Sequence, residues 1–305
     1  MRILIVGAGA VGGYFGARLA RAGRDVTFLV RPARAQRLRE SGLAVASPAG
    51  NDVVSPTVLT REQITDSYDV ILLTVKAYGL AAALDDLGPA VGPETVIIPT
   101  LNGIAHIDQL QRRFGSERVF GGVCVIAAQL DADGTIRHLG MDPSLRFGEL
   151  DGPISPRAQE IGALFTVPGF DVTLSEAILT DLWEKWVFLS SAAATTCLLD
   201  GTIGEIAAAG GEGVVHAIID EATAVARAAG RPPRPASDRR TRSVLTTAGS
   251  TFTASMFRDR ADGLPIEREQ IIGDLVDRGR AAGLALPLLT AANVTLTGYE
   301  QRRTC

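Results

Sequence analysis

The chain has 305 residues, of which 46% are hydrophobic and 21% charged, a balance typical of a folded globular protein that excludes a disordered one. Its formal net charge of −4 gives no overall positive field, so we expect neither nucleic acid nor a membrane as a partner. Its 3 cysteines and 3 histidines are too widely scattered for a disulfide framework or a protein-built metal site, and they fit a reducing, cytoplasmic compartment.

The N-terminal stretch MRILIVGAGAVGGYFGARLA imitates a secretory signal peptide, because a basic residue precedes an apolar run and then small residues. The apolar core of a signal peptide is helical and rarely holds glycines at positions such as 7, 9, 12, 13 and 16. We therefore interpret the stretch as part of the folded protein. No run in the chain reaches the ~18 apolar residues that a membrane-spanning helix needs.

The first half of the chain alternates apolar strands with helical patterns. The strands are near-continuous apolar runs, as in a parallel sheet covered on both faces. They span residues 2–6, 25–30, 69–75 and 95–99. Helical patterns lie between and after them, at residues 11–22, 78–87 and 104–113. This alternation predicts a doubly wound α/β domain with a mostly parallel sheet.

The pattern changes from about residue 118. A D-x-D-G turn at 131–134 separates two strand-like runs and predicts an antiparallel addition to the α/β domain. A helix at about 155–166 and a short strand at 170–173 should complete this domain.

Ala-rich helical patterns dominate after about Ser175, and strands become scarce. We therefore predict a Rossmann-like, NADP-binding domain at 1–174 and an all-α substrate and catalytic domain at 175–305. Within the helical half we expect residues 230–240 to form a loop, because the prolines there exclude a continuous helix. The arginines near this loop could form a phosphate-binding patch, but the net charge favours a solvated loop with acidic neighbours.

The motif Gly7-x-Gly9-x-x-Gly12 directly follows the first strand and opens a helix. The first glycine permits a tight turn, the second a close approach to a pyrophosphate, and the third close packing of helix on strand. The helix N-terminus, with Ala10 and Val11, should attract the phosphate charge. The motif therefore predicts a dinucleotide cofactor.

Arg31 stands at the end of the second strand, with Arg34 three residues further on. Domains that prefer NAD place an acidic residue there to hold the ribose 2′-hydroxyl. A guanidinium suits a 2′-phosphate instead, so the sequence predicts NADPH. Arg34 could equally lie on the solvated face of a following helix.

Lys76 and Asn102 each follow an apolar strand, and the carboxyl ends of parallel strands form the edge where ligands bind. Lys76 could instead be an exposed lysine that begins a helix. Asn102 could be a helix cap, or its amide could hold a substrate or the nicotinamide.

Six stretches, in this order and spacing, make the chain resemble the ketopantoate reductases (2-dehydropantoate 2-reductases) over nearly its whole length. They are GAGAVGGYFGARLARAG, Arg31, TVKAY, LNG, LWEKW and SMFRDRADGLPIEREQIIGDLV. The resemblance implies a Rossmann domain followed by a helical domain, with NADPH and substrate in the cleft between them. It also implies reduction of a 2-oxo acid to a 2-hydroxy acid, as in pantothenate biosynthesis.

The resemblance places the family's catalytic lysine at Lys185, its substrate-binding glutamate at Glu267 and the serine that meets the substrate carboxylate at Ser255. Lys76 and Asn102 match cofactor and active-site positions. A lysine suits the reaction, since a cation can stabilise the charge that grows on the carbonyl oxygen and then donate the proton. From the residues alone, Glu267 could be a first-turn helix acid and Ser255 a helix cap.

The chain departs from the family one and two helical turns after Lys185, where Leu189 and Ala193 stand in place of asparagines. These positions share one helix face with the lysine, so an apolar wall would replace a polar one. A substrate hydroxyl left unpaired there would cost about 1–3 kcal/mol. We therefore hypothesise a 2-oxo acid more apolar than ketopantoate. Hydroxyls of Ser190, Ser191 or Thr196 could compensate.

Two other functions stay open. An imine or other ketone reductase could use the same scaffold with Lys185 as proton donor. An NADPH-binding sensor would need the glycine motif and Arg31 but not Lys185, Ser255 and Glu267 together. The Ala-rich helices could supply a homodimer face, although core helices have the same pattern.

Overall fold

The computed structural model describes residues 1–48, 50–140 and 142–304, which fold into two compact units. The first unit consists of residues 1–101 and 106–178. The second contains the chain from residue 179 onward together with the short segment 102–105. A few residues that follow a strand of the first unit therefore pack with the helices of the second.

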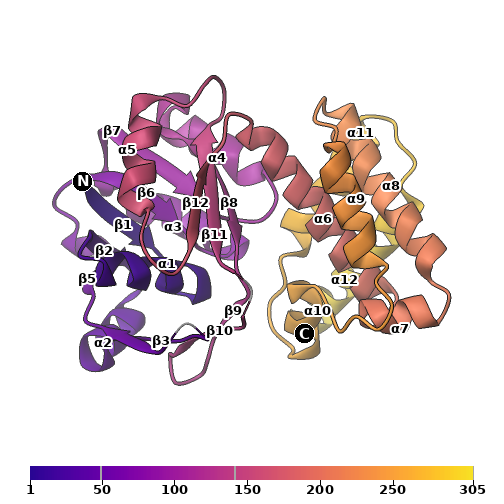
Figure 1. Ribbon diagram of the computed structural model, residues 1–305, viewed down its shortest axis with the longest axis horizontal. Helices are drawn as coiled ribbons and strands as arrows, with labels where there is room; N and C mark the ends of the chain where they lie inside the picture. The colour runs from indigo at the N-terminus through magenta and orange to yellow at the C-terminus, as the bar shows by residue number, and fades with distance from the viewer. Residues whose placement is uncertain (49, 141, 305) are drawn as a thin grey trace. The chain divides into compact units, whose positions relative to one another are not determined.

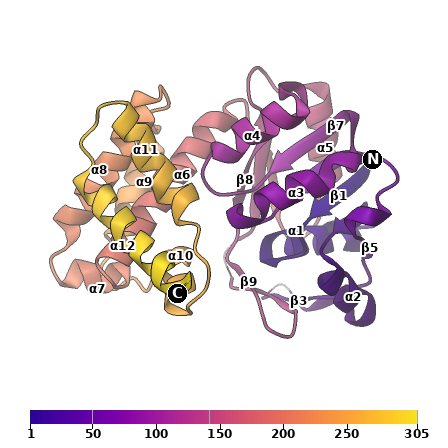
Figure 2. The same ribbon diagram turned by 180° about the vertical axis from the view of Figure 1, so that it is seen from behind.

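A parallel sheet in the order β5-β2-β1-β6-β7 forms the centre of the first unit. Its strands are β1 (Arg2–Val6), β2 (Asp25–Leu29), β5 (Thr57–Leu59), β6 (Tyr68–Leu73) and β7 (Val91–Pro99). The helices α1 (Ala10–Arg21) and α3 (Leu80–Leu87) lie on opposite faces of it (Figures 1 and 2). Coverage of both faces explains the near-continuous apolar strands and confirms the predicted doubly wound domain.

Two smaller sheets complete the first unit. One has the order β4-β3-β10-β9 and the other β12-β11-β8. Their strands are β3 (Leu43–Ala46), β4 (Asp52–Val54), β9 (Ala128–Leu130), β10 (Ile136–His138), β8 (Phe120–Val125), β11 (Ser144–Glu149) and β12 (Asp171–Leu174). β9 pairs antiparallel with β10 across the 131–134 turn, and β8 pairs antiparallel with β11. The predicted antiparallel addition is therefore confirmed.

The remaining helical segments of the first unit are short. The α-helices are α2 (Pro32–Ser41), α4 (Ala105–Phe114) and α5 (Pro156–Phe165). The 3-10 helices are η1 (Arg61–Gln63), η2 (Ala77–Gly79), η3 (Gly88–Ala90) and η4 (Ser116–Arg118).

The regular elements in the described part of the second unit are all helices, as predicted. Its helices are α6 (Ile178–Leu198), α7 (Ile203–Ala208), α8 (Glu212–Ala228), α9 (Pro235–Leu245), α10 (Ser255–Ala261), the π-helix η5 (Glu269–Gly273), α11 (Asp274–Ala281) and α12 (Pro287–Thr304). They share one apolar core, to which α6 contributes Trp186, α8 Ile218 and α12 Leu289.

The predicted loop at 230–240 is wrong in its second half, because α9 begins at Pro235. Proline is tolerated at the first helical position, where the missing N–H would have no partner within the helix. Arg234 bonds to Glu184 and Asp181 at the start of α6, and these bonds raise its pKa. This arginine is therefore neutralised by carboxylates of its own unit, as the solvated-loop interpretation expected, rather than available to a phosphate.

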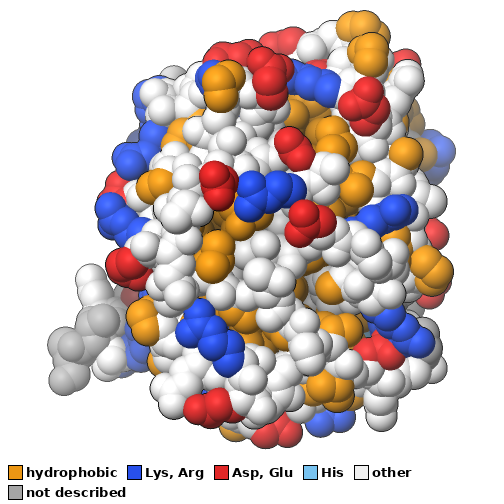
Figure 3. All heavy atoms as spheres, turned by 90° about the vertical axis from the view of Figure 1, so that its left-hand side faces the viewer, with side chains coloured by type: hydrophobic (Ala, Val, Ile, Leu, Met, Phe, Trp, Pro, Cys, Tyr) orange, Lys and Arg blue, Asp and Glu red, His pale blue; other side chains and the backbone are white. Residues whose placement is uncertain are grey.

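The exposed surface offers few clues to a partner. No helix within the described residues is long and apolar enough to cross a membrane. On the face shown in Figure 3, Lys and Arg side chains are interspersed with Asp and Glu, and neither sign gathers into a single patch.

Candidate active site

The glycine motif has the geometry that close backbone packing requires. Gly7 has a φ of +97°, a conformation that favours glycine. A Cβ added at Gly12 would lie 2.1 Å from Oγ1 of Thr74 and 2.2 Å from the Gly7 carbonyl oxygen, so only glycine fits there. A Cβ added at Gly9 would meet no atom within 4 Å. The backbone at Gly9 therefore borders open space at the N-terminus of α1.

That N-terminus suits an anion. The helix begins at Ala10 and continues through Val11, and its first turn contains no acidic residue. Its unpaired N–H groups and the positive end of its dipole are thus available to a phosphate.

The glycine motif follows β1 and Lys76 follows β6, so both lie at the edge of the sheet where these neighbouring strands end. β1 pairs with β6, and the helices that follow them cover opposite faces (Figures 1 and 2). Thr74 links the two segments, since its hydroxyl lies 2.9 Å from the Val6 carbonyl oxygen and 3.0 Å from that of Gly7. Lys76 is exposed and directly precedes η2. This is the position where open α/β sheets bind ligands.

Three arginines at the start of α2 have no acidic partner among the described residues. Arg31 is exposed at the start of α2, and Arg34 and Arg37 follow at helical spacing. The Arg34 guanidinium donates to the Ala8 carbonyl oxygen at 3.2 Å. Burial, and secondarily the charge of Arg37, lower the pKa of Arg34. Among the described residues none of the three forms an ion pair, whereas other arginines of this unit pair with carboxylates, as in Arg18, Arg21, Arg61 and Arg113.

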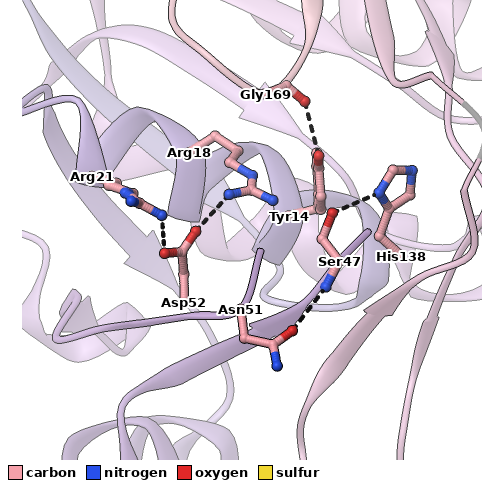
Figure 4. A network of polar contacts seen from close by, with 8 residues as sticks. All are labelled: Tyr14, Arg18, Arg21, Ser47, Asn51, Asp52, His138 and Gly169. Carbon is pink, nitrogen blue, oxygen red and sulfur yellow. Dashed lines mark hydrogen bonds and ion pairs between the residues drawn. The ribbon is translucent and has the colours of Figure 1, made fainter. Parts of the chain in front are cut away.

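A polar network holds α1 through the side chains of Tyr14, Arg18 and Arg21 (Figure 4). Asp52 of β4 receives hydrogen bonds from Arg18, at 2.5 Å, and from Arg21. The hydroxyl of Tyr14 donates to the Gly169 carbonyl oxygen at 2.8 Å. These contacts join the glycine helix to the small sheet and to the loop before β12, and so fix the direction in which its N-terminus points.

Within the second unit the structure brings Asn102 and Glu267 together. The Asn102 amide Nδ2 lies 3.5 Å from Oε2 of Glu267, although the two residues are 165 positions apart in sequence. Glu267 is only 7% exposed. Asn102 thus directs its amide at a buried carboxylate rather than capping a helix.

The glycine after Asn102 makes this approach possible. Gly103 has a φ of +74°, and a Cβ there would lie 2.4 Å from the backbone oxygen of Gln270 in η5. The segment 102–105 therefore packs directly on the π-helix that follows Glu267. π-helices are rare and occur frequently at functional sites.

Lys185 lies on a half-buried face of α6. Phe188 and Leu189, three and four residues on, share that face and are also half-buried. The Phe188 ring is 6.0 Å from that of Phe252, in the loop before α10. Ala193 departs from the expectation, because it is 1% exposed and belongs to the core. Of the two apolar positions, only Leu189 retains exposed surface.

The hydroxyls that could have compensated for the missing asparagines are buried. Ser190 and Thr196 donate to carbonyl oxygens of their own helix. Ser191 is fully buried, and its hydroxyl has no hydrogen-bond partner within the described part of the chain. The face of α6 that follows Lys185 is therefore apolar, whereas Asp181 precedes it by one turn.

Ser255 is exposed at the first position of α10, and it is not the helix cap, since Ala254 occupies that position. Its hydroxyl makes no hydrogen bond with any described residue, so it is accessible to a ligand.

Three residues near the candidate residues of the two units were missed from the sequence. Arg37 and Phe188 could have been found, because each follows a predicted site residue at helical spacing. Phe252 had no such signal, since only the folded loop brings it to Phe188.

The cysteines do not suit nucleophilic chemistry. Cys124 and Cys197 are buried and form no disulfide among the described residues, and burial raises the pKa of Cys197 to about 11. Cys305 lies outside the described residues. No group of three His, Cys, Asp or Glu side chains able to hold a metal occurs in the described ranges.

Comparison with known protein families gives a match over most of the chain. Residues 3–152 match the family model described as ketopantoate reductase PanE/ApbA. Residues 177–300 match the model of the C-terminal part of the same family.

Individual relatives agree with this match. An uncharacterized oxidoreductase of Bacillus subtilis strain 168, YkpB, is 35% identical over 99% of this chain and 100% of its own length. The crystal structure of 2-dehydropantoate 2-reductase from Methylococcus capsulatus is 28% identical, with a TM-score of 0.89 over 100% of this chain and 98% of that chain. A D-mandelate dehydrogenase solved with NADH and anilino(oxo)acetate shares the fold, with a TM-score of 0.90 at 22% identity over 100% of both chains.

Proposed function

This chain belongs to the ketopantoate reductase family of oxidoreductases, and on that premise we propose that it reduces a 2-oxo acid to a 2-hydroxy acid with NADPH. In this proposal residues 1–174 hold the cofactor, and residues 175–305 bind the substrate and supply the proton. The observation that carries it is the Asn102 amide directed at the buried carboxylate of Glu267. An amide and a carboxylate from distant parts of the chain are thus held together.

The preference for NADPH is supported by Arg31, Arg34 and Arg37 at the start of α2, of which Arg34 contacts the glycine motif. Gly7, Gly9, Gly12 and the first turn of α1 would hold the pyrophosphate. Arg31, with no carboxylate partner among the described residues, would bind the 2′-phosphate. Burial, and secondarily the charge of Arg37, lower the pKa of Arg34, and an anion there would offset the second of these causes.

The bound nicotinamide would supply a hydride to the carbonyl carbon of the substrate. Lys185 would stabilise the negative charge that grows on the carbonyl oxygen and donate the proton to it. Glu267 would orient the lysine or the substrate, with Asn102 holding the carboxylate in place. The exposed hydroxyl of Ser255 would donate to the substrate carboxylate.

The substrate we propose is an apolar 2-oxo acid with a branched or aromatic side chain. Its support is the face of α6 that follows Lys185, where Phe188 and Leu189 present apolar surface and the nearby hydroxyls bond within their own helix. The hydroxyl of ketopantoate would find no side-chain partner on this face. Binding of an aromatic 2-oxo acid analogue by the D-mandelate dehydrogenase with this fold is consistent with such a substrate.

The test is the rate of NADPH oxidation with a panel of 2-oxo acids, simple ketones and imines. We expect branched or aromatic 2-oxo acids to give a higher kcat/KM than ketopantoate, by about 10-fold, as expected for one unpaired polar group. A clear preference for ketopantoate would contradict the substrate class. Tight NADPH binding without turnover of any compound would contradict the enzyme and favour a sensor.

A further inference from the structure

Trp186 lies directly after Lys185 on α6, and its side chain faces the core of the second unit. It is 1% exposed, and its indole Nε1 donates to the Ile271 carbonyl oxygen at 2.9 Å. Ile271 lies in the middle of the π-helix η5. The indole N–H of this tryptophan therefore reaches the backbone of the segment that follows Glu267.

Ile271 is joined to Glu267 by a second hydrogen bond. The Ile271 N–H donates to the Glu267 carbonyl oxygen at 3.1 Å. The C=O and N–H groups of Ile271 thus connect the Trp186 indole to the backbone of Glu267. The carboxylate of Glu267 in turn accepts a hydrogen bond from the Asn102 amide. The bonds run from the residue next to Lys185 to the acidic group of the same site.

π-helices are rare and occur mostly as single widened turns inside α-helices. η5 runs directly into α11, and the Trp186 indole N–H adds a side-chain donor to the Ile271 carbonyl oxygen of this turn. Since Gly103 packs on the adjacent Gln270, the same turn also positions Asn102.

We propose that Trp186 is a positioning residue, whose indole N–H fixes η5 and thereby places Glu267 correctly relative to Lys185. The inference rests on the proposed roles of Lys185 and Glu267. It makes the N–H group, and not only the bulk of the ring, necessary for efficient turnover.

The ring has packing contacts that must be separated from the hydrogen bond. Trp183 lies 4.9 Å from it, ring centre to ring centre, and the Arg278 guanidinium is 5.7 Å from its centre. Trp186→Phe keeps an aromatic ring and removes the donor. Trp186→His loses more volume, but its Nε2 takes the place of the indole nitrogen and restores a donor. Trp183→Phe is the matched control, since the Trp183 indole makes no hydrogen bond with the described residues and is also buried.

The experiment measures kcat/KM for the best 2-oxo acid, the Kd of NADPH, and hydrogen–deuterium exchange of backbone amides in 268–273. For Trp186→Phe we expect kcat/KM to fall about 10-fold, as for one buried hydrogen bond, with the NADPH Kd within about 2-fold and faster exchange in this segment. Trp186→His should retain more activity and more protection than Trp186→Phe, and Trp183→Phe should match the wild type.

A higher kcat/KM for Trp186→Phe than for Trp186→His would overturn the inference, because volume rather than the donor would then matter. Equal losses of kcat/KM in Trp186→Phe and Trp183→Phe would overturn it too. In either case, turnover by the unmutated enzyme would leave the proposed function intact. If Trp186→Phe does not fold, the test depends on Trp186→His. A folded and active Trp186→His supports the role of the donor, and a folded but inactive one contradicts it. Absence of wild-type turnover would instead refute the proposed function itself.

Discussion

Replacing Arg31 with alanine should change the cofactor preference of the enzyme. In the structure Arg31 is exposed at the start of α2 and has no carboxylate partner among the described residues, so its full charge is available to a 2′-phosphate. A charge-assisted hydrogen bond changes affinity by about 10- to 150-fold, and exposure to water favours the lower end of that range. We therefore expect the KM for NADPH to rise about 10-fold and the KM for NADH to stay within about 2-fold.

The assay is steady-state oxidation of NADPH and of NADH at fixed substrate concentration. Arg113→Ala is the matched control, because Arg113 lies in the same unit but is paired with Asp85 at 2.8 Å. Arg34→Ala should weaken both cofactors, since Arg34 also donates to the Ala8 carbonyl oxygen of the glycine motif. An equal rise in KM for the two cofactors in Arg31→Ala, or a wild-type preference for NADH, would refute the assignment of Arg31 to the 2′-phosphate.

Three further predictions follow from individual side chains. Asp52→Asn removes the carboxylate that the 6% exposed Arg18 needs. It should destabilise the first unit by about 3 kcal/mol and lower its Tm by roughly 6–12 °C, and a change under about 2 °C in a thermal melt would show that the pair contributes little. Leu189→Asn should raise kcat/KM for ketopantoate relative to an apolar 2-oxo acid by about 10-fold, and an unchanged ratio would remove this residue from substrate selection. Burial raises the pKa of Cys197 from 9.0 to about 11, so its thiol should resist iodoacetamide at pH 9 in the native protein, and the free energy of unfolding should fall as the pH rises between these values. Labelling is measured by mass spectrometry, and rapid labelling of the native protein would contradict the burial of this thiol.

The central sheet could be predicted because its strands are covered on both faces. Strands β1 and β6 are long apolar runs, and no helical pattern competes with them. The short strands were missed, as in β4 and β5, each of three residues, because so few positions do not reveal an alternating pattern. Their pairing is decided by the chain on either side rather than by their own sequence.

The backbone geometry of the glycine motif was predictable for a similar reason. The spacing of Gly7, Gly9 and Gly12 reflects local backbone geometry, so the sequence contains it completely. The same was not true of α6, where Ala193 turned out to face the core. Spacing shows which residues share a face, but the neighbouring helices decide where the buried sector ends.

The contact between Asn102 and Glu267 had no local signal. Each residue precedes a helix, and either could have been an ordinary cap or helix-start acid. Only packing of the 102–105 segment on η5 joins them, and that packing is possible because residue 103 is a glycine, which has no Cβ. The hydrogen bond of Trp186 to Ile271 was equally hidden, since it lies on the buried side of α6.

The proton-donor role of Lys185 is tested most directly by single-turnover reduction of the best 2-oxo acid by the NADPH complex of Lys185→Ala. We predict that NADPH binds with a Kd within about 2-fold of the wild type while the rate of NADPH oxidation falls by about 10²- to 10⁴-fold, the usual contribution of a general acid. A Lys185→Ala complex that oxidises NADPH at the wild-type rate would contradict the account.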